Sequence, residues 1–158
     1  MASSPSAETA VAEFAGQLFF RLWRASHTRI AEALEAVGLT PPLFGILNVL
    51  GAREGAIQQE IGSAMAIDPS TMVSLVDDLE TSGLAKRRPH PTDRRAREVV
   101  ITPKGRRALK RARRLAMQVD DEVLGGLTAA ERRQLLTLLR RALDSAPSQS
   151  LWRAEEGD

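Results

Sequence analysis

The segment "PHPTDRRAREVVIT" holds the residues of this chain that are best suited to bind a polyanion. Its three arginines, Arg94, Arg95 and Arg97, follow one aspartate, Asp93, between two short segments of strand-like composition. Paired strands at these positions would place the arginines at the tip of a β-hairpin. Such a tip can enter the narrow minor groove of duplex DNA, where the negative potential is enhanced.

Asp93 gives this tip a means of holding its shape. Flexible arginines repel one another, whereas a carboxylate among them can accept a bidentate bond from Arg95 or Arg97. An exposed pair of this kind adds little to stability. We therefore predict that Asp93 structures the tip and thereby positions the arginines.

Positive charge is concentrated around this segment. Residues 86–114 carry 13 of the 22 basic residues against two acidic ones, a local charge of +11, although the whole chain carries only +2. Such asymmetry indicates a polyanionic partner. A solvated arginine-rich helix face is the alternative explanation when the run is taken alone.

Several function classes lack the residues they need. The chain has no cysteine, and its two histidines, His27 and His90, have no ligand spacing, so we expect no metal and no cofactor. No group of acids or serines indicates catalysis, so we expect no enzyme. The N-terminus does not resemble a signal peptide, and the longest apolar run falls short of the ~20 residues that cross a bilayer. These features predict a cytoplasmic protein without a membrane partner.

The remaining sequence predicts a mainly α fold of six helices with a two-stranded β-wing. Three helices should begin at a cap residue followed by proline, and two should end at glycine. These signals are Thr40-Pro41, Asp68-Pro69, Thr102-Pro103, Gly38 and Gly83. Thr128 and Glu131 form a capping box for a last helix. The expected order is four helices, the strands 84–88 and 97–101 with Val99 and Ile101 facing inward and Val100 outward, and two further helices.

The helix expected after Asp68 has the pattern of a recognition helix. Met72, Leu75, Val76 and Leu79 would form its packing face, and its first turns would be exposed. The residues left outward are Pro69, Ser70, Thr71, Val73 and Ser74. Serine and threonine can bond base edges or phosphates in a major groove, and a valine can contact a thymine methyl group. An ordinary amphipathic helix is the alternative.

Residues 67–109, "IDPSTMVSLVDDLETSGLAKRRPHPTDRRAREVVITPKGRRAL", resemble the recognition helix, wing and following helix of the MarR family of transcriptional regulators. "PTDRRAR" is similar to the wing signature of that family, with Asp93 and Arg95 matching its D-x-R pair. The resemblance extends over roughly residues 8–145. Val73-Ser74 and Asp78 depart from residues that are frequent in the family, which bears on base preference.

The resemblance implies a homodimer held by the first and last two helices. The implied divisions are a disordered tail (1–7), an N-terminal dimerisation helix (8–38), a winged helix-turn-helix DNA-binding lobe (39–102), C-terminal dimerisation helices (103–145) and a flexible tail (146–158). The implied function is that of a regulator, most simply a repressor, that binds a pseudo-palindromic operator in double-stranded DNA. The alternative is a winged-helix architectural or protein-interaction module without operator specificity.

Further basic residues are assigned to the same DNA surface. Arg87 lies in the first wing strand, and Arg106 and Arg107 belong to the basic run from Lys104 to Arg114. Cations at a helix N-terminus oppose the helix dipole, at a cost of ~0.3–1 kcal/mol each, which a nearby phosphate would offset. Pairing of this run with acids of the partner subunit is the alternative.

Members of the family commonly bind small aromatic or phenolic anions between the dimer helices and the DNA-binding lobe, although some need no effector. By position, the residues that could line such a ligand site are Trp23, His27 and Phe44. Core packing is the alternative role for the two aromatic residues among them.

Overall fold

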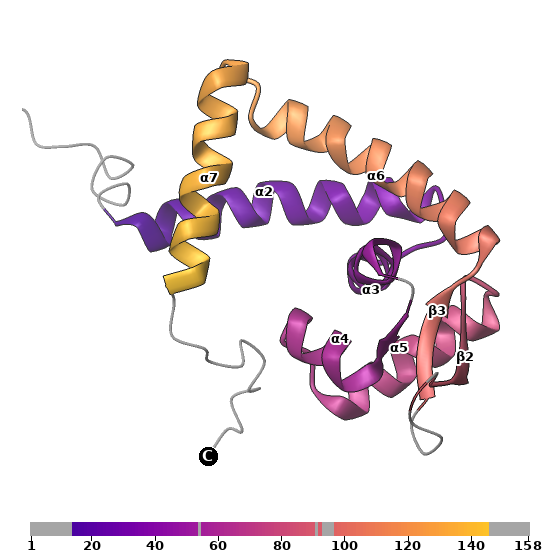
Figure 1. The fold of residues 1–158 in the computed structure, drawn as a ribbon. Coiled ribbons are helices and arrows are strands. Elements are labelled where there is room, and N and C mark those ends of the chain that lie inside the picture. The colour runs from indigo at the N-terminus through magenta and orange to yellow at the C-terminus, as the bar shows by residue number, and fades with distance from the viewer. Residues whose placement is uncertain (1–13, 54, 91, 93–96, 146–158) are drawn as a thin grey trace, which may run out of the picture.

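The computed structural model describes residues 14–53, 55–90, 92 and 97–145, and within them the chain is mainly helical (Figure 1). In chain order the elements are α2 (Ala15–Glu35), α3 (Pro41–Ala52), β1 (Ala56–Ile57), α4 (Gln58–Met65), α5 (Pro69–Thr81), β2 (Ala85–Pro89), β3 (Arg97–Ile101), α6 (Pro103–Val123) and α7 (Ala129–Ser145). The predicted mainly α fold with six helices is confirmed. Residues 8–13, where the first helix was expected to begin, lie outside the described residues.

The predicted helix starts are present as side-chain caps. An amide hydrogen of the first turn is accepted by Thr40 at 3.5 Å, by Asp68 at 2.9 Å and by Thr102 at 3.0 Å. Proline follows each cap residue, where its missing N–H has no intrahelical partner to lose. At α7, Thr128 and Glu131 exchange the two hydrogen bonds of a capping box.

The hydrophobic core is built around α3, as its nearly all-apolar sequence predicts. Leu43, Ile46, Leu47 and Leu50 of this helix are buried. The core continues into the end of α2, the inner faces of α4 and α5, the sheet and the first half of α6. The segment from α3 to β3 and the long helices α2 and α6 therefore share one core.

The wing hairpin is part of a larger sheet than the sequence indicated. Strands β2 and β3 are antiparallel, with Ala85 opposite Ile101 and Pro89 opposite Arg97. The strand order is β1-β3-β2, so β3 is the central strand and the two-residue strand β1 pairs with its other edge. The prediction of two paired strands is confirmed, but β1 was missed because a two-residue strand has no periodicity to detect.

The prediction that Val100 faces outward is wrong. Val99, Val100 and Ile101 are all buried. A Cβ atom built on Gly55 would lie 3.1 Å from Val100 Cγ1 and 2.1 Å from Glu98 Oε2, so the backbone before β1 covers the second face of β3. Alternation along β3 could not reveal this cover, because the covering residue lies 45 positions earlier in the chain.

Apolar side chains remain exposed on the outer helices. The exposed large hydrophobic residues of α2, α6 and α7 are Leu18, Phe19, Phe20, Leu22, Trp23, Met117, Leu136, Leu138 and Leu143. Helix α7 buries none of its residues in the single chain. Within the described part of the chain, no helix is both long and apolar enough to cross a membrane.

Candidate nucleic-acid interface

Helix α5 presents its N-terminal turns to solvent while its other face packs. Met72, Val76 and Leu79 are buried against the core. The five residues predicted to face outward are all exposed: Pro69, Ser70, Thr71, Val73 and Ser74. Val73 retains 46% of its surface. The predicted division of α5 into a packing face and an exposed start is therefore present.

Asp68 fixes the start of α5. Its Oδ1 accepts hydrogen bonds from the Ser70 hydroxyl at 2.5 Å and from the Thr71 amide at 2.9 Å. These bonds hold the pKa of Asp68 well below its ordinary value. The cap is therefore ionised at neutral pH, next to the positive end of the helix dipole.

The sharp turn between α4 and α5 sets the angle of α5 against α4. Ala66 adopts the left-handed conformation with φ +53°, and the Ile67 amide donates to the Gly62 carbonyl at 2.9 Å. A Cβ atom on Gly62 would lie 3.0 Å from the Ile67 carbonyl oxygen, so this position favours glycine. The two helices can therefore pack closely as a helix-turn-helix pair.

The described base of the wing, strands β2 and β3, lies beside α5 (Figure 1), and it carries Arg97 on an exposed strand end. Just after the end of β2, Nδ1 of His90 accepts a hydrogen bond from the Thr92 backbone amide at 3.4 Å. Three of the predicted tip residues, Asp93, Arg94 and Arg95, lie outside the described residues, so the proposed Asp93 pairing is untested.

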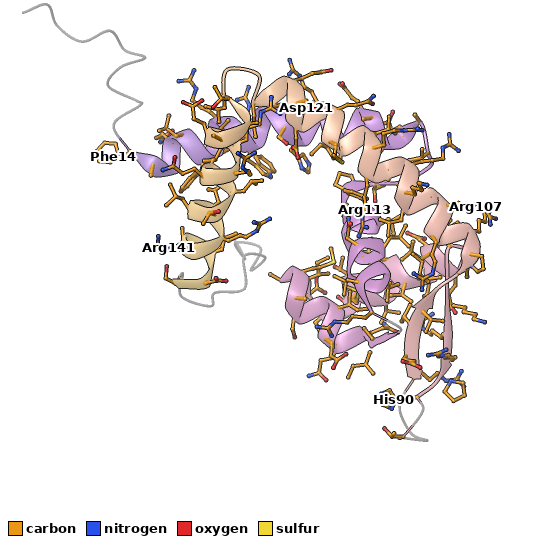
Figure 2. All side chains as sticks on the ribbon, turned by 45° about the horizontal axis from the view of Figure 1, so that its top comes forward. Phe14, His90, Arg107, Arg113, Asp121 and Arg141 are labelled. Atoms are coloured by element: carbon orange, nitrogen blue, oxygen red, sulfur yellow. The ribbon has the colours of Figure 1, made fainter. Side chains whose placement is uncertain are left out.

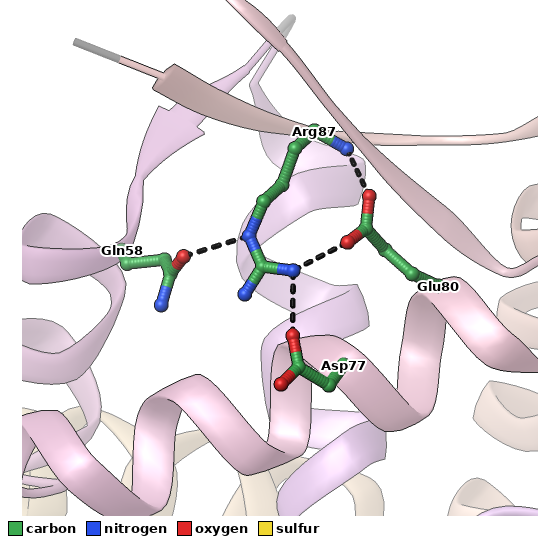
Figure 3. Close-up of polar contacts among 4 residues, drawn as sticks. All are labelled: Gln58, Asp77, Glu80 and Arg87. Atoms are coloured by element: carbon green, nitrogen blue, oxygen red, sulfur yellow. Dashed lines mark hydrogen bonds and ion pairs between the residues drawn. The ribbon is translucent and has the colours of Figure 1, made fainter.

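The sequence places Arg87 on the predicted DNA surface, but its guanidinium faces α4 and α5 (Figure 3). Its Nε donates to Gln58 Oε1 at 2.9 Å, and its Nη1 donates to Asp77 Oδ1 at 2.6 Å and to a carboxylate oxygen of Glu80. The other oxygen of Glu80 accepts from the Arg87 backbone amide at 2.6 Å. We call Gln58, Asp77, Glu80 and Arg87 the Arg87 cluster.

The Arg87 cluster is partly withdrawn from water. The Arg87 side chain is 20% exposed. Burial opposes its charge, but the hydrogen bonds to Asp77 and Glu80 outweigh this effect and raise the pKa of Arg87 above its ordinary value. The cluster joins α4, α5 and β2 through one side chain.

Sequence reasoning missed this cluster, although a signal was present. Side chains two residues apart on a strand face the same way, so Arg87 shares the face of the buried Ala85. An arginine on an inward face requires a carboxylate partner. Asp77 and Glu80, three residues apart on the preceding helix, supply two.

The start of α6 carries Arg107 at the end of the β2–β3 hairpin opposite His90 (Figure 2). Arg106 and Arg107 are both exposed, and the Lys104 ammonium donates to the Ser82 carbonyl at 2.8 Å. Arg113, further along, donates to Asn48 of α3 at 2.8 Å. The predicted basic run is therefore partly tied to the fold, while its two designated arginines are open to solvent.

Comparison with known proteins decides the family. A model of the MarR family matches residues 37–96. A putative transcriptional regulatory protein for the hcr operon of Thauera aromatica is 37% identical over 144 residues, which cover 89% of this chain and 87% of that protein. The chain belongs to the MarR family.

Solved structures of MarR-type regulators share the fold. The CouR repressor bound to a 23-mer DNA duplex is 30% identical, with a TM-score of 0.78, over 89% of this chain and 99% of that chain. CouR from Rhodococcus jostii RHA1 bound to p-coumaroyl-CoA is 26% identical, with a TM-score of 0.77, over 88% of this chain and 98% of that chain. The arrangement of α4, α5 and the wing is thus a winged helix-turn-helix of the MarR family.

The residues predicted for a ligand site of the MarR type are only partly brought together. The rings of Trp23 and His27 stack on α2 with their centroids 4.7 Å apart, and Trp23 is 54% exposed. Phe44, by contrast, packs against the core. A groove of about 510 Å³ follows α6, and its described lining residues are Gly51, Arg106, Leu109, Lys110, Arg113, Arg114, Met117, Gln118 and Asp121. The ligand role of Trp23, His27 and Phe44 stays a prediction. No cluster of potential metal ligands occurs among the described residues.

Proposed function

We propose that this MarR family protein binds a pseudo-palindromic operator as a homodimer and represses transcription. The observation that carries the proposal is the α5 helix, whose first turns are exposed while the face behind them is buried. A helix of this kind fits the major groove, reading bases with its N-terminal residues. The DNA-bound structure of CouR, a repressor of the same fold, supports this assignment.

Each part of the lobe then has a role on DNA. Ser70, Thr71, Val73 and Ser74 face base edges and adjoining phosphates, with Pro69 at the entry of the helix. Arg97 and the tip arginines Arg94 and Arg95 reach the flanking minor groove, with Asp93 structuring the tip. Arg106 and Arg107 contact the phosphate backbone outside the wing.

A homodimer accounts for the exposed apolar residues of the outer helices. Phe19 and Phe20 of α2 are 50% and 53% exposed, and Leu138 and Leu143 of α7 are 50% and 71% exposed. Several large apolar side chains left exposed on the outer helices favour an interface there. A two-fold dimer would place two α5 helices about 34 Å apart, in successive major grooves.

An effector would act on the spacing of the two lobes. A small aromatic or phenolic anion bound between the dimer helices and the lobe, beside Trp23 and His27, would release DNA if it favoured a spacing that does not match the operator. The binding of p-coumaroyl-CoA by CouR supports an aromatic effector of this kind.

Selection of bound sequences from a random duplex pool, at near-physiological salt, tests the proposal. The expected result is an inverted repeat whose half-sites are one helical turn apart, and Arg95→Ala should weaken the enrichment of its flanks. Retention that depends only on duplex length and salt would contradict operator binding. It would support an architectural module instead.

A further inference from the structure

We propose that Arg87 is a positioning residue that fixes the wing relative to the recognition helix and does not itself contact DNA. This inference rests on the proposed DNA-binding function, because it concerns how two DNA-reading elements are held together. The Arg87 guanidinium is directed at α4 and α5, and it is committed to Gln58, Asp77 and Glu80 (Figure 3).

The connections of Arg87 suit a positioning role. Glu80 of α5 accepts from both the backbone amide and the guanidinium of Arg87, so it holds the main chain of β2 as well as the side chain. Gln58 ties the same guanidinium to the first turn of α4. A planar guanidinium can meet three partners at fixed angles, which a lysine ammonium on a flexible stem does not reproduce.

The charges in the cluster also favour positioning over DNA contact. Asp77 and Glu80 together carry two negative charges on the recognition helix, and Arg87 supplies one positive charge. Carboxylates close to a phosphate backbone oppose binding. With two negative charges against one positive, the cluster offers a phosphate no net attraction, whereas an arginine that joins β2 to α5 requires such partners.

A fixed wing has a consequence for specificity. If α5 and the wing form one rigid unit, the minor-groove flank read by the wing lies at a constant distance from the bases read by α5. Without the Arg87 cluster the wing can sample several angles, and the flank preference should spread over neighbouring positions. The cluster therefore determines the spacing within each half-site.

The decisive variant is Glu80→Gln, because the two roles of Arg87 predict opposite results. If Glu80 positions the wing through Arg87, Glu80→Gln should lower operator affinity by about tenfold and blur the position of the flank in a sequence selection. If Arg87 instead contacts phosphate, removing a nearby carboxylate should leave affinity unchanged or raise it. That second result would overturn the inference.

Arg87→Lys tests the same inference with the charge kept. It should blur the flank position as Glu80→Gln does, while the dependence of log affinity on log salt concentration stays at the wild-type slope. Wild-type flank selectivity in this variant would contradict a role for the guanidinium geometry. A slope lower by about 0.9 in Arg87→Gln, with flank position intact, would identify Arg87 as a phosphate contact.

Two controls separate this inference from folding and from the proposed function. Glu35→Gln removes an exposed carboxylate at the C-terminal end of α2, outside the Arg87 cluster, and should match the wild type in every measurement. Thermal unfolding identifies any variant with lost structure, and Arg87→Lys is the variant that best preserves the fold. If the wild type selects no inverted repeat, the proposed function and this inference fail together; if it does and the variants keep the flank position, only this inference fails.

Discussion

The carboxylate of Glu98 lies 2.6 Å from Nε of Arg88 at the base of the wing. Glu98 is the buried charged residue of the described core, at 5% exposure, because the Gly55 backbone covers it. The Arg88 side chain is 45% exposed, so the ion pair has one end in water and one end under the chain. Removing Arg88 therefore leaves a buried carboxylate without a partner, whereas removing Glu98 leaves an arginine that water can still solvate.

Arg88→Ala should destabilise the fold by about 1–3 kcal/mol, because it leaves a buried carboxylate without its partner. In a Glu98→Gln background the same substitution should cost less, since an amide carries no charge to desolvate. Urea denaturation of the two single variants and the double variant gives the coupling free energy. Equal costs of Arg88→Ala in both backgrounds would show that the pair does not matter to stability.

The Asp68 cap should make stability depend on pH in the acid range. Hydrogen bonds from Ser70 and Thr71 lower the pKa of Asp68 in the folded state. Its contribution is therefore present above the pKa of the unfolded state, near 3.9, and is lost as the pH falls from there towards the folded value.

Comparison with Asp68→Asn isolates this effect, because asparagine caps the helix without a titrating group. The advantage in melting temperature of the wild type over Asp68→Asn should be constant from pH 7 to 5 and should shrink between pH 4 and 3. A difference that stays constant down to pH 3 would contradict the linkage.

The exposed end of α7 should carry part of the dimer interface. Leu143 is 71% exposed in the single chain, so Leu143→Asp should leave the fold of each subunit intact. If the dimer buries this side chain, losing its burial costs about 1.5–3 kcal/mol, and an added carboxylate costs more, so the dimer dissociation constant should rise at least tenfold. Sedimentation velocity measures the shift, and circular dichroism checks the helices. An unchanged dimer would place the interface away from Leu143.

The sequence predicts those features of the structure that are determined by residues close together in the chain. The starts of α3, α5 and α6 follow from a cap residue and a proline within a few positions, so they are predictable from Thr40, Asp68 and Thr102. The exposure of the first turns of α5 follows from helical periodicity. The sequence therefore predicts most helices and the outward face of the recognition helix.

The features that the sequence did not predict depend on contacts between residues far apart in the chain. Val100 is buried by the backbone at Gly55, 45 positions earlier, and the two-residue strand β1 is defined only by its pairing with β3. Arg87 looked like one more cation of a basic stretch, because its charge is visible in the sequence while the direction of its side chain is not. Its carboxylate partners are set by the packing of β2 against α5.

The basic start of α6 leads to a prediction about ionic strength. Arg106 and Arg107 are exposed at the start of α6, whereas the Lys104 ammonium is bonded to the Ser82 carbonyl, so of these three the two arginines are the better candidates to contact phosphates. Each phosphate neutralised by a cation contributes about 0.9 to the slope of log affinity against log salt concentration. The Arg106→Ala/Arg107→Ala double variant should therefore lower the magnitude of this slope by about 1.8.

Affinity for the selected operator measured at four salt concentrations from 50 to 300 mM, a range chosen to span physiological ionic strength, gives the slope. The base preference of the double variant should match that of the wild type, because phosphate contacts position the protein without reading sequence. Arg133→Ala, an exposed arginine of α7, serves as the matched control for loss of positive charge and should keep the wild-type slope. An unchanged slope in the double variant would show that Arg106 and Arg107 do not neutralise phosphates. A raised dimer dissociation constant in the same variant would then assign them to acids of the partner subunit.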